Sequence, residues 1–261
     1  MDFRFIMPLY RTEAIVIRSH PYGESDKIVT FLSRDFGKIK GIAKGARRSK
    51  KRFQNALGLF SHIRLIFFDR EGMGLVRAES CDILHAFPKL REDLRKILGG
   101  TYFLELMDGM AGEREENREA FDLLLSFLLT LNAEEFKEEQ LRMFEIRTLS
   151  LFGYRPNMRR CGVCRREMEE LRESSSGFFS IERGTFICGI CSQGRQNLMP
   201  LSLGTARLIE QISQMELAKL QRLRFTSLAL LEARELLPKF IAYQLGKGLK
   251  SLEAMKILPP E

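Results

Sequence analysis

The spacing of apolar residues changes near residue 85. Before that point, short stretches rich in β-branched and aromatic residues are separated by turns that contain glycine or proline, a pattern typical of β-strands. It predicts five strands, at residues 13–20, 26–35, 38–45, 59–69 and 75–84. Five strands in a segment of this length favour a small closed barrel, and the OB type matches their number and size.

After Pro88 the apolar residues recur with the period of an α-helix. This pattern predicts helices at residues 88–110, 116–131, 135–152, 202–216 and 226–246. Pro88 suits a first helical turn, and Gly153 and Ser202 suit a C-terminal cap and an N-cap. Pro238 is expected to kink or divide the last helix.

Four of the five cysteines form two short motifs, CGVC and CGIC, 23 residues apart. A two-residue gap lets both thiolates of a motif reach one ion, so two such motifs predict a tetrahedral site for one structural Zn²⁺. The predicted ligands are Cys161, Cys164, Cys188 and Cys191. Two disulfides, a redox pair and an iron–sulfur cluster are the alternatives. Cys81 stands alone and is interpreted as a buried apolar residue.

These elements predict an α+β multidomain chain with four segments. They are an OB-type β-barrel that binds nucleic acid (1–85), a first helical part (86–156), an inserted four-cysteine zinc-ribbon-like module with a hairpin at 178–188 (157–199), and a second helical part (200–261). The helices on the two sides of the insertion are expected to form one α-helical bundle. The acidic stretch 113–120 is interpreted as a solvated helix start.

Charge is concentrated in the predicted barrel. The 261 residues carry a net charge of +8, and residues 1–85 hold 16 Lys and Arg against 9 Asp and Glu. Half of those cations lie in one run without an acid, at Lys38, Lys40, Lys44, Arg47, Arg48, Lys50, Lys51 and Arg52. A cationic run on a folded barrel favours phosphate binding, because Lys and Arg neutralise phosphates and release counterions. A merely solvated loop and a targeting signal are the alternatives.

Aromatic residues near the run offer surfaces on which bases can stack. The candidates are Tyr22, Phe31, Phe36, Phe53 and Phe60. Because aromatic residues of small barrels more often belong to the core, at most one or two of them are expected to be exposed.

The sequence lacks the motifs that accompany common catalytic sites. It has no phosphate-binding P-loop, no G-x-S-x-G and no H-E-x-x-H, and its three histidines have no evident catalytic partners. We therefore expect a binding protein rather than an enzyme. No stretch reads as a membrane span or a signal peptide, which favours a cytoplasmic protein.

The stretch YRTEAIVIRSHPYGESDKIVTFLSRDFGKIKGIAKGARRSKKR, together with FGYRPNMRRCGVC and CGICSQG, resembles the bacterial recombination mediator family RecO, in its zinc-bearing members. The resemblance covers essentially the whole chain. It implies binding of single- and double-stranded DNA, annealing of complementary strands and association with the nucleoid. The partners that it implies are RecR, the C-terminal tail of single-stranded DNA-binding protein (SSB) and, indirectly, RecA.

Two other functions remain open at this point. A protein-interaction adaptor would use the helices and the zinc module to recruit partners, and an RNA-binding, translation-associated factor would also combine a small barrel with a zinc ribbon. An adaptor is expected to show little salt-sensitive affinity for nucleic acid, and an RNA-binding factor is expected to prefer RNA to DNA.

Overall fold

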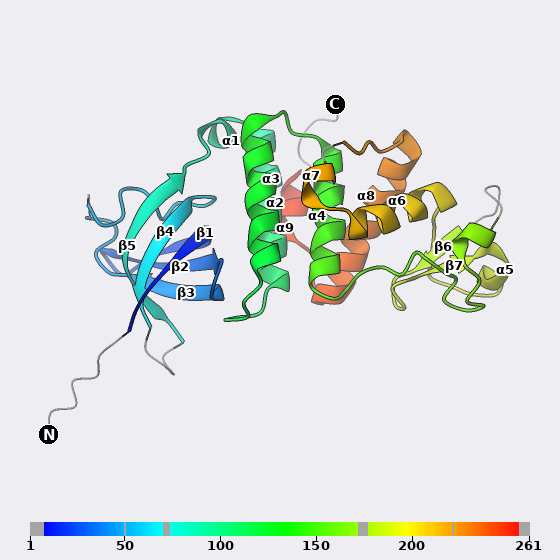
Figure 1. The fold of residues 1–261 in the computed structure, drawn as a ribbon, viewed down its shortest axis with the longest axis horizontal. Helices are drawn as coiled ribbons and strands as arrows, with labels where there is room; N and C mark the ends of the chain where they lie inside the picture. Colours follow the sequence, from blue (N-terminus) through cyan, green and yellow to red (C-terminus); the bar gives the residue numbers. More distant parts are fainter. Residues whose placement is uncertain (1–7, 50, 70–73, 172–176, 221, 256–261) are drawn as a thin grey trace, which may run out of the picture. The chain divides into compact units, whose positions relative to one another are not determined.

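A computed structural model describes residues 8–49, 51–69, 74–171, 177–220 and 222–255 (Figure 1). Its contacts divide the chain into two compact units, residues 1–135 and 136–261. The first unit joins the five-stranded barrel to helices α1–α3, and the second contains α4–α9 and a three-stranded sheet. The division into four segments therefore stays a prediction, whereas the α+β class is confirmed.

The five predicted strands are present in the first unit. Their bounds are β1 Leu9–Tyr22, β2 Asp26–Ser33, β3 Gly37–Ala43, β4 His62–Phe68 and β5 Val76–His85. They form a closed barrel in the order β1-β2-β3-β5-β4, in which β3 pairs with β5 in parallel and the other neighbours are antiparallel. This order is that of an OB-type barrel, as predicted.

The barrel encloses its own apolar core. Alternate residues of each strand point inward, as the pleat of a strand requires, and Val16, Phe31, Leu65 and Phe67 are fully buried there. A register shift between Val16 and Arg18 bends β1, so that its first half pairs with β4 and its second half with β2. One long strand thus closes the barrel.

Helices α1 (Pro88–Glu92), α2 (Leu94–Met110) and α3 (Arg118–Ala133) complete the first unit. The single helix predicted at 88–110 is wrong, because Asp93 has an extended conformation and its carboxylate caps the backbone N–H of Lys96 at 3.1 Å. Pro88 does occupy the first turn of α1, as expected. Helices α2 and α3 pack against each other, and each contacts β1.

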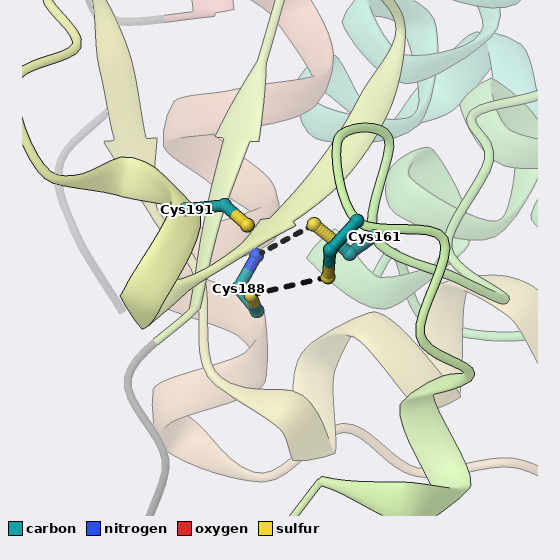
Figure 2. Close-up of side chains that lie close together, drawn as sticks. Cys161, Cys188 and Cys191 are labelled. Carbon is teal, nitrogen blue, oxygen red and sulfur yellow. Dashed lines mark hydrogen bonds between the residues drawn. The ribbon is translucent and has the colours of Figure 1, made fainter.

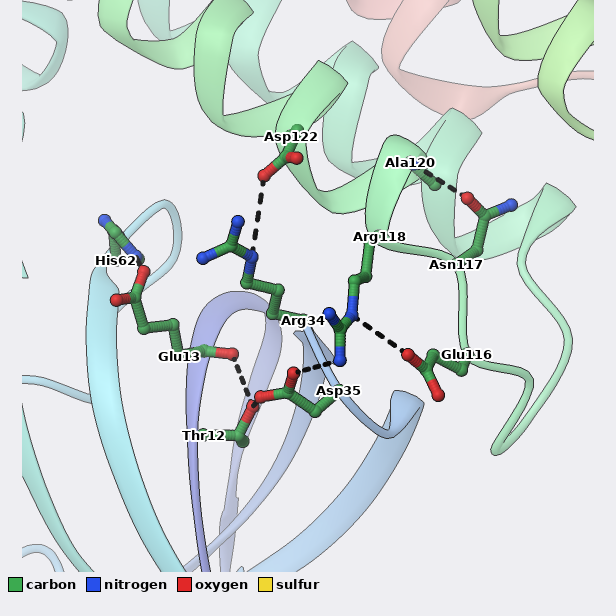
Figure 3. A network of polar contacts seen from close by, with 10 residues as sticks. All are labelled: Thr12, Glu13, Arg34, Asp35, His62, Glu116, Asn117, Arg118, Ala120 and Asp122. Atoms are coloured by element: carbon green, nitrogen blue, oxygen red, sulfur yellow. Dashed lines mark hydrogen bonds and ion pairs between the residues drawn. The ribbon is translucent and has the colours of Figure 1, made fainter.

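A polar network ties the turn between β2 and β3 to the beginning of α3 (Figure 3). Arg118 pairs with Asp35 at 3.1 Å, and Asp35 also accepts a hydrogen bond of 2.7 Å from the hydroxyl of Thr12. The side chain of Asn117 caps α3 by accepting from the N–H of Ala120. The barrel and α3 are therefore linked by several polar contacts within one unit.

The second unit is mostly helical. Its helices are α4 (Glu138–Leu151), α5 (Gly189–Ser192), α6 (Leu203–Gln214), α7 (Leu217–Leu220), α8 (Ser227–Leu245) and α9 (Lys250–Met255). Helix α4 packs against α6 and α8, so this helix does lie with those that follow the cysteine segment, whereas α1–α3 belong to the first unit. Pro238 was expected to kink or divide the last helix, and α8 runs through it without being divided. Buried Ala233, Leu236, Leu237 and Phe240 anchor α8 on both sides of the proline.

The cysteine segment contains the expected hairpin. Strands β6 (Gly177–Ser180) and β7 (Thr185–Cys188) pair antiparallel, and β8 (Leu198–Pro200) pairs with the other edge of β6. A short 3₁₀ turn spans Met168–Glu170. The ring of Phe179 packs edge-on against Phe240 of α8, with centroids 5.3 Å apart. Within the described residues, every helix is too short or too polar to cross a lipid bilayer.

Candidate nucleic-acid interface and metal centre

The basic run begins on strand β3, where its first two lysines face acids of the same unit. Lys38 donates a hydrogen bond of 2.6 Å to the backbone oxygen of Asp108, and its ammonium lies 3.6 Å from the carboxylate of that residue. Lys40 pairs with Glu113 at 2.6 Å. The hydrogen bond from Lys40 lowers the pKa of Glu113 from its ordinary value. Both strand lysines are thus partly neutralised within the protein.

The acidic stretch between α2 and α3 supplies part of this neutralisation. Its interpretation as a solvated helix start holds only for its end, where Asn117 caps α3 and Glu119 lies in the first turn. The beginning of the stretch, at Glu113 and Arg114, instead lies against β3. The backbone N–H of Arg114 donates to the carbonyl of Lys38 at 2.9 Å. At Gly37, which has a φ of +62°, a Cβ would overlap the backbone of Glu115. This close approach explains why glycine stands at the start of β3.

The second half of the run lies between β3 and β4. At its start, Gly45 donates a backbone hydrogen bond of 2.8 Å to the carboxylate of Asp26, and this bond holds the pKa of Asp26 below its usual value. At its end, Phe53 and Leu57 are buried in the barrel core. The carbonyl of Arg52 accepts from the N–H of Cys81 on β5 at 2.9 Å. The loop is therefore fixed to the barrel on both sides of its charges.

Most of the described cations of this loop are exposed to solvent, and Arg52, which pairs with Glu79 at 3.9 Å, is the exception among them. Lys44, Arg47, Arg48 and Lys51 are exposed, whereas Arg52 is half-buried and lies over the ring of Phe53. Among the described residues, Lys44, Arg47 and Lys51 make no ion pair, and Arg48 reaches only the exposed Glu24, at 3.7 Å. Lys50 lies outside the described residues. We call the five described cations, from Lys44 to Arg52, the cationic loop.

Most of the aromatic residues near the run are buried, as expected. Phe31, Phe53 and Phe60 are buried, and Phe36 packs between Tyr10 and Phe67. Only Tyr22, at the end of β1, is largely exposed among the five candidates, at 54%. The sequence did not indicate which ring would be exposed, because strand register and barrel closure decide it.

The four predicted metal ligands come together in the second unit. All four Sγ atoms lie within 4.8 Å of one another, and those of Cys164 and Cys188 are 3.9 Å apart. A tetrahedral zinc site with bonds of about 2.3 Å places its sulfur atoms about 3.8 Å apart. The cluster therefore fits one metal ion of this kind. In Figure 2 the labelled cysteines converge from three places: Cys161 from a loop, Cys188 from the end of β7 and Cys191 from the short helix α5.

The backbone around the cluster favours negative charge on sulfur. The N–H of Cys188 donates to Sγ of Cys161 at 3.4 Å. Although desolvation raises the pKa of Cys161, the N–H groups of Cys188, Cys164 and Val163 lower it to a net value of about 6. Desolvation raises the pKa of Cys191 to about 12. One thiolate thus forms readily near neutral pH, and a bound cation would favour the loss of the other protons.

Glycine is needed at the first turn of this cluster. The N–H of Gly162 donates to the carbonyl of Phe186 on β7 at 2.8 Å. A Cβ at position 162 would overlap the side chain of Thr185. The CGVC loop therefore lies directly on the hairpin, which brings two of the ligands to the other two.

The histidines and the fifth cysteine belong to strands of the barrel. Cys81 is buried in the barrel core, as predicted, and burial raises its pKa to about 12. His62 is buried, and its Nδ1 lies 2.9 Å from Nδ1 of His85 while its Nε2 lies 3.2 Å from Glu13. The sequence did not indicate this pair, because it depends on the register of β4 with β5.

Comparisons with known proteins agree with this architecture. The family model described as "Recombination protein O N terminal" matches residues 7–87, and "Recombination protein O C terminal" matches residues 91–253. The two models together cover most of the chain and place it in a class of recombination proteins. The relatives point to the same family. "DNA repair protein RecO" of Syntrophus aciditrophicus is 36% identical over 248 residues, which are 94% of this chain and 95% of that protein.

Other relatives cover the chain to the same extent. "DNA repair protein RecO" of Symbiobacterium thermophilum is 32% identical over 97% of this chain and 98% of that protein. The protein of the same name from Thermodesulfovibrio yellowstonii is 33% identical, over 91% and 94%. The chain belongs to the RecO family.

Proposed function

We propose that this chain is a recombination mediator that binds single- and double-stranded DNA and anneals complementary strands. The observation that carries the proposal is the cationic loop, because it holds exposed charges in fixed positions on an OB-type barrel. Phosphates on two strands repel each other, and cations that neutralise both would lower this repulsion. Annealing by this route needs binding alone, so we propose that the protein is not an enzyme.

All eight residues of the basic run belong to the proposed interface, but their contributions are expected to differ. Lys38 and Lys40 already face Asp108 and Glu113, whereas Lys44 and Lys51 make no ion pair among the described residues. The loop lysines can therefore engage phosphates without first giving up an internal partner. If about five phosphates are engaged, affinity should fall several hundredfold between roughly 50 and 200 mM salt.

Two double variants with equal loss of charge test this difference. Lys44→Ala with Lys51→Ala is expected to reduce the slope of log K against log salt by about 2 on duplex DNA, and Lys38→Ala with Lys40→Ala by less than about 1. Fluorescence anisotropy with labelled oligonucleotides measures both, and circular dichroism checks that the variants are folded. Equal slopes for the two variants would contradict the special role of the loop.

The complete loop variant, with Lys44, Arg47, Arg48, Lys51 and Arg52 replaced by Ala, tests the function itself. It is expected to lose salt-dependent DNA binding and strand annealing together. If both persist, the interface is elsewhere. Salt-insensitive, weak binding by the unmodified protein would favour an adaptor, and a clear preference for RNA over DNA of the same sequence would favour a translation-associated factor.

For the cysteine cluster we propose one structural Zn²⁺ per chain, held by Cys161, Cys164, Cys188 and Cys191. Four sulfur ligands leave no open position for a substrate, and soft thiolates suit zinc. An iron–sulfur cluster would instead give visible absorbance and bound iron. Elemental analysis of the purified protein is expected to find about one zinc and no iron.

Membership in the RecO family supports a set of protein partners for the same function. We propose that the chain acts with RecR, contacts the C-terminal tail of SSB and helps RecA to load onto SSB-covered DNA, in the cytoplasm at the nucleoid. The test is RecA filament formation on SSB-covered single strands, with and without this protein and RecR. An unchanged rate would contradict the mediator role while leaving DNA binding intact.

A further inference from the structure

The two turns that carry the cysteine ligands expose the same combination of side chains. Val163 precedes the last cysteine of CGVC, and Ile190 precedes the last cysteine of CGIC. Both are solvent-exposed, Val163 at 36% and Ile190 at 70%. Each therefore places a branched apolar side chain beside a ligand of the same cluster.

Arginines accompany each apolar tip. Arg165 and Arg166 directly follow the first turn, and Arg195 follows the second; all three are exposed. The Nε of Arg195 donates to the carbonyl of Cys191 at 2.8 Å, which holds this side chain at the second turn. The backbone N–H of Arg165 donates to the carbonyl of Cys161 at 2.9 Å, which fixes the chain at the first.

The acid nearest to Arg166 in the chain already has a partner. Glu167, which follows Arg166 in the chain, pairs with Arg159 at 3.5 Å. In the part of the chain that the structure describes, Arg165 and Arg166 make no ion pair. The surface formed by Val163, Ile190, Arg165, Arg166 and Arg195, which we call the knuckle surface, is therefore apolar at its tips and cationic around them.

From this repeated pattern we propose that the knuckle surface of the second unit binds single-stranded nucleic acid, as a second site made of other residues than the cationic loop. A nucleotide chain repeats a flat apolar base and an anionic phosphate, and the knuckle surface repeats an apolar tip and an arginine. Guanidinium groups bind phosphate with two hydrogen bonds and also stack on bases. Unpaired bases expose the faces that such tips need, whereas duplex bases do not.

A single tryptophan gives a direct test, because the chain contains none. In the Ile190→Trp variant of the full-length, metal-loaded protein, a thymidine oligonucleotide is expected to quench the emission, since a base stacks on the indole. The same change should tighten single-strand binding by about fivefold. A Leu228→Trp variant, at an exposed position of α8, is the matched control and should show no quenching.

Two further variants separate the apolar tips from the arginines. Val163→Ser with Ile190→Ser should weaken single-strand binding roughly threefold and leave duplex binding unchanged, whereas the control Leu228→Ser with Leu231→Ser should change neither. Replacing Arg165, Arg166 and Arg195 by Ala should lower the single-strand salt slope by about 2. Metal content has to equal that of the unmodified protein in every variant.

The outcomes distinguish this site from the proposed function of the barrel. Quenching of the Ile190→Trp variant should persist when the cationic loop is replaced by alanine, at a higher oligonucleotide concentration. Unchanged tryptophan emission, at an oligonucleotide concentration that saturates the protein in an anisotropy titration, would overturn the proposal. Quenching by an acidic peptide with apolar side chains, but not by oligonucleotides, would also overturn it and would make the surface a peptide site.

Discussion

The barrel and the cysteine module are both small β structures, but they are stabilised in different ways. The barrel closes around its own apolar core, with Phe31, Leu65 and Phe67 fully buried. The module has three strands of three or four residues, and the Sγ atoms of Cys161, Cys188 and their two partners lie together in it. A closed barrel can carry a long charged loop without losing its core, whereas we propose that the module needs a bound ion to hold its two turns together.

The difference also determines how each region responds to change. An apolar core spreads its stabilisation over many side chains. Burial of each large side chain contributes about 1.5–3 kcal/mol. A four-ligand metal site concentrates the stabilisation in one bound ion. Replacement of a single ligand should therefore cause a large loss of stability that is confined to the module. Replacement of a single core residue should cause a smaller loss that is spread over the barrel.

The largest effect is expected for the loss of one metal ligand. Structural zinc sites contribute about 10–16 kcal/mol of binding free energy, which is also folding free energy. Cys188→Ser should abolish metal binding and unfold residues 157–199, while the amides of the barrel keep their protection. Elemental analysis and hydrogen exchange measure the two results.

Cys81→Ala is the matched control for this prediction, since Cys81 lies in the barrel core and outside the cluster. It should keep about one metal ion per chain. Retention of the metal by Cys188→Ser, with normal exchange in the module, would contradict the idea that the ion holds this region together.

A core truncation in the barrel should have the next largest effect. Phe31→Ala removes a fully buried ring and is expected to lower the free energy of unfolding by about 3–5 kcal/mol. Tyr22→Ala, at an exposed ring, should change it by less than about 0.5 kcal/mol. Denaturant titration checks both values. Loss of the metal from Phe31→Ala would show that the barrel and the module do not respond separately.

Mild acid should destabilise the barrel through His62. Desolvation lowers the pKa of this buried ring, although Glu13 raises it; His85 lowers it further, and Phe121 packs on it from α3. Below the ordinary pKa of about 6.5, the unfolded chain gains a proton that the folded barrel does not. Neutral, buried His62 therefore contributes fully to stability above a pH of about 6.5. The contribution is lost progressively as the pH falls below that value.

His62→Gln should make the unfolding free energy less dependent on pH between about 7.5 and 5.5. His20→Gln, which changes an exposed histidine of β1, is the control and should leave the dependence as it is. If the two variants behave alike, acid acts on the barrel through other groups.

The smallest effect is expected for the pair between Lys40 and Glu113. Both side chains are about half exposed, so a double-mutant cycle with Lys40→Ala and Glu113→Gln should give a coupling of about 0.2–1 kcal/mol. The coupling should shrink at high salt. A coupling of several kcal/mol would mean that the acidic segment before α3 supports the barrel much more strongly than an exposed pair can.

Local sequence patterns predicted much of the fold. The barrel strands were found because alternation along the chain reports the two faces of a strand, and the cysteine ligands because their spacing reports the turns that hold them. The break at Asp93 was missed, since a single capping residue within a helical pattern changes little in the apolar period. The contacts of Glu113 were missed because no local pattern indicates that it reaches a lysine 73 residues away.

The sequence did contain a signal that the basic loop is attached to the barrel. Phe53 and Leu57 follow the basic run, and such apolar residues indicate that the loop returns to the core. Which charges would stay exposed was not indicated. Lys38 and Lys44 have the same chemistry and lie six residues apart, yet one faces Asp108 and the other faces solvent.

The sequence by itself determined the strand and helix pattern, the four-thiolate site and the concentration of positive charge in the first third of the chain. These features depend on residue type and on spacing within one element, so they can be read locally. Only the tertiary structure decided which cations are neutralised, which ring is exposed and how His62 meets His85. Those outcomes depend on strand register and on the packing of distant segments, because electrostatic and van der Waals interactions act between neighbours in space.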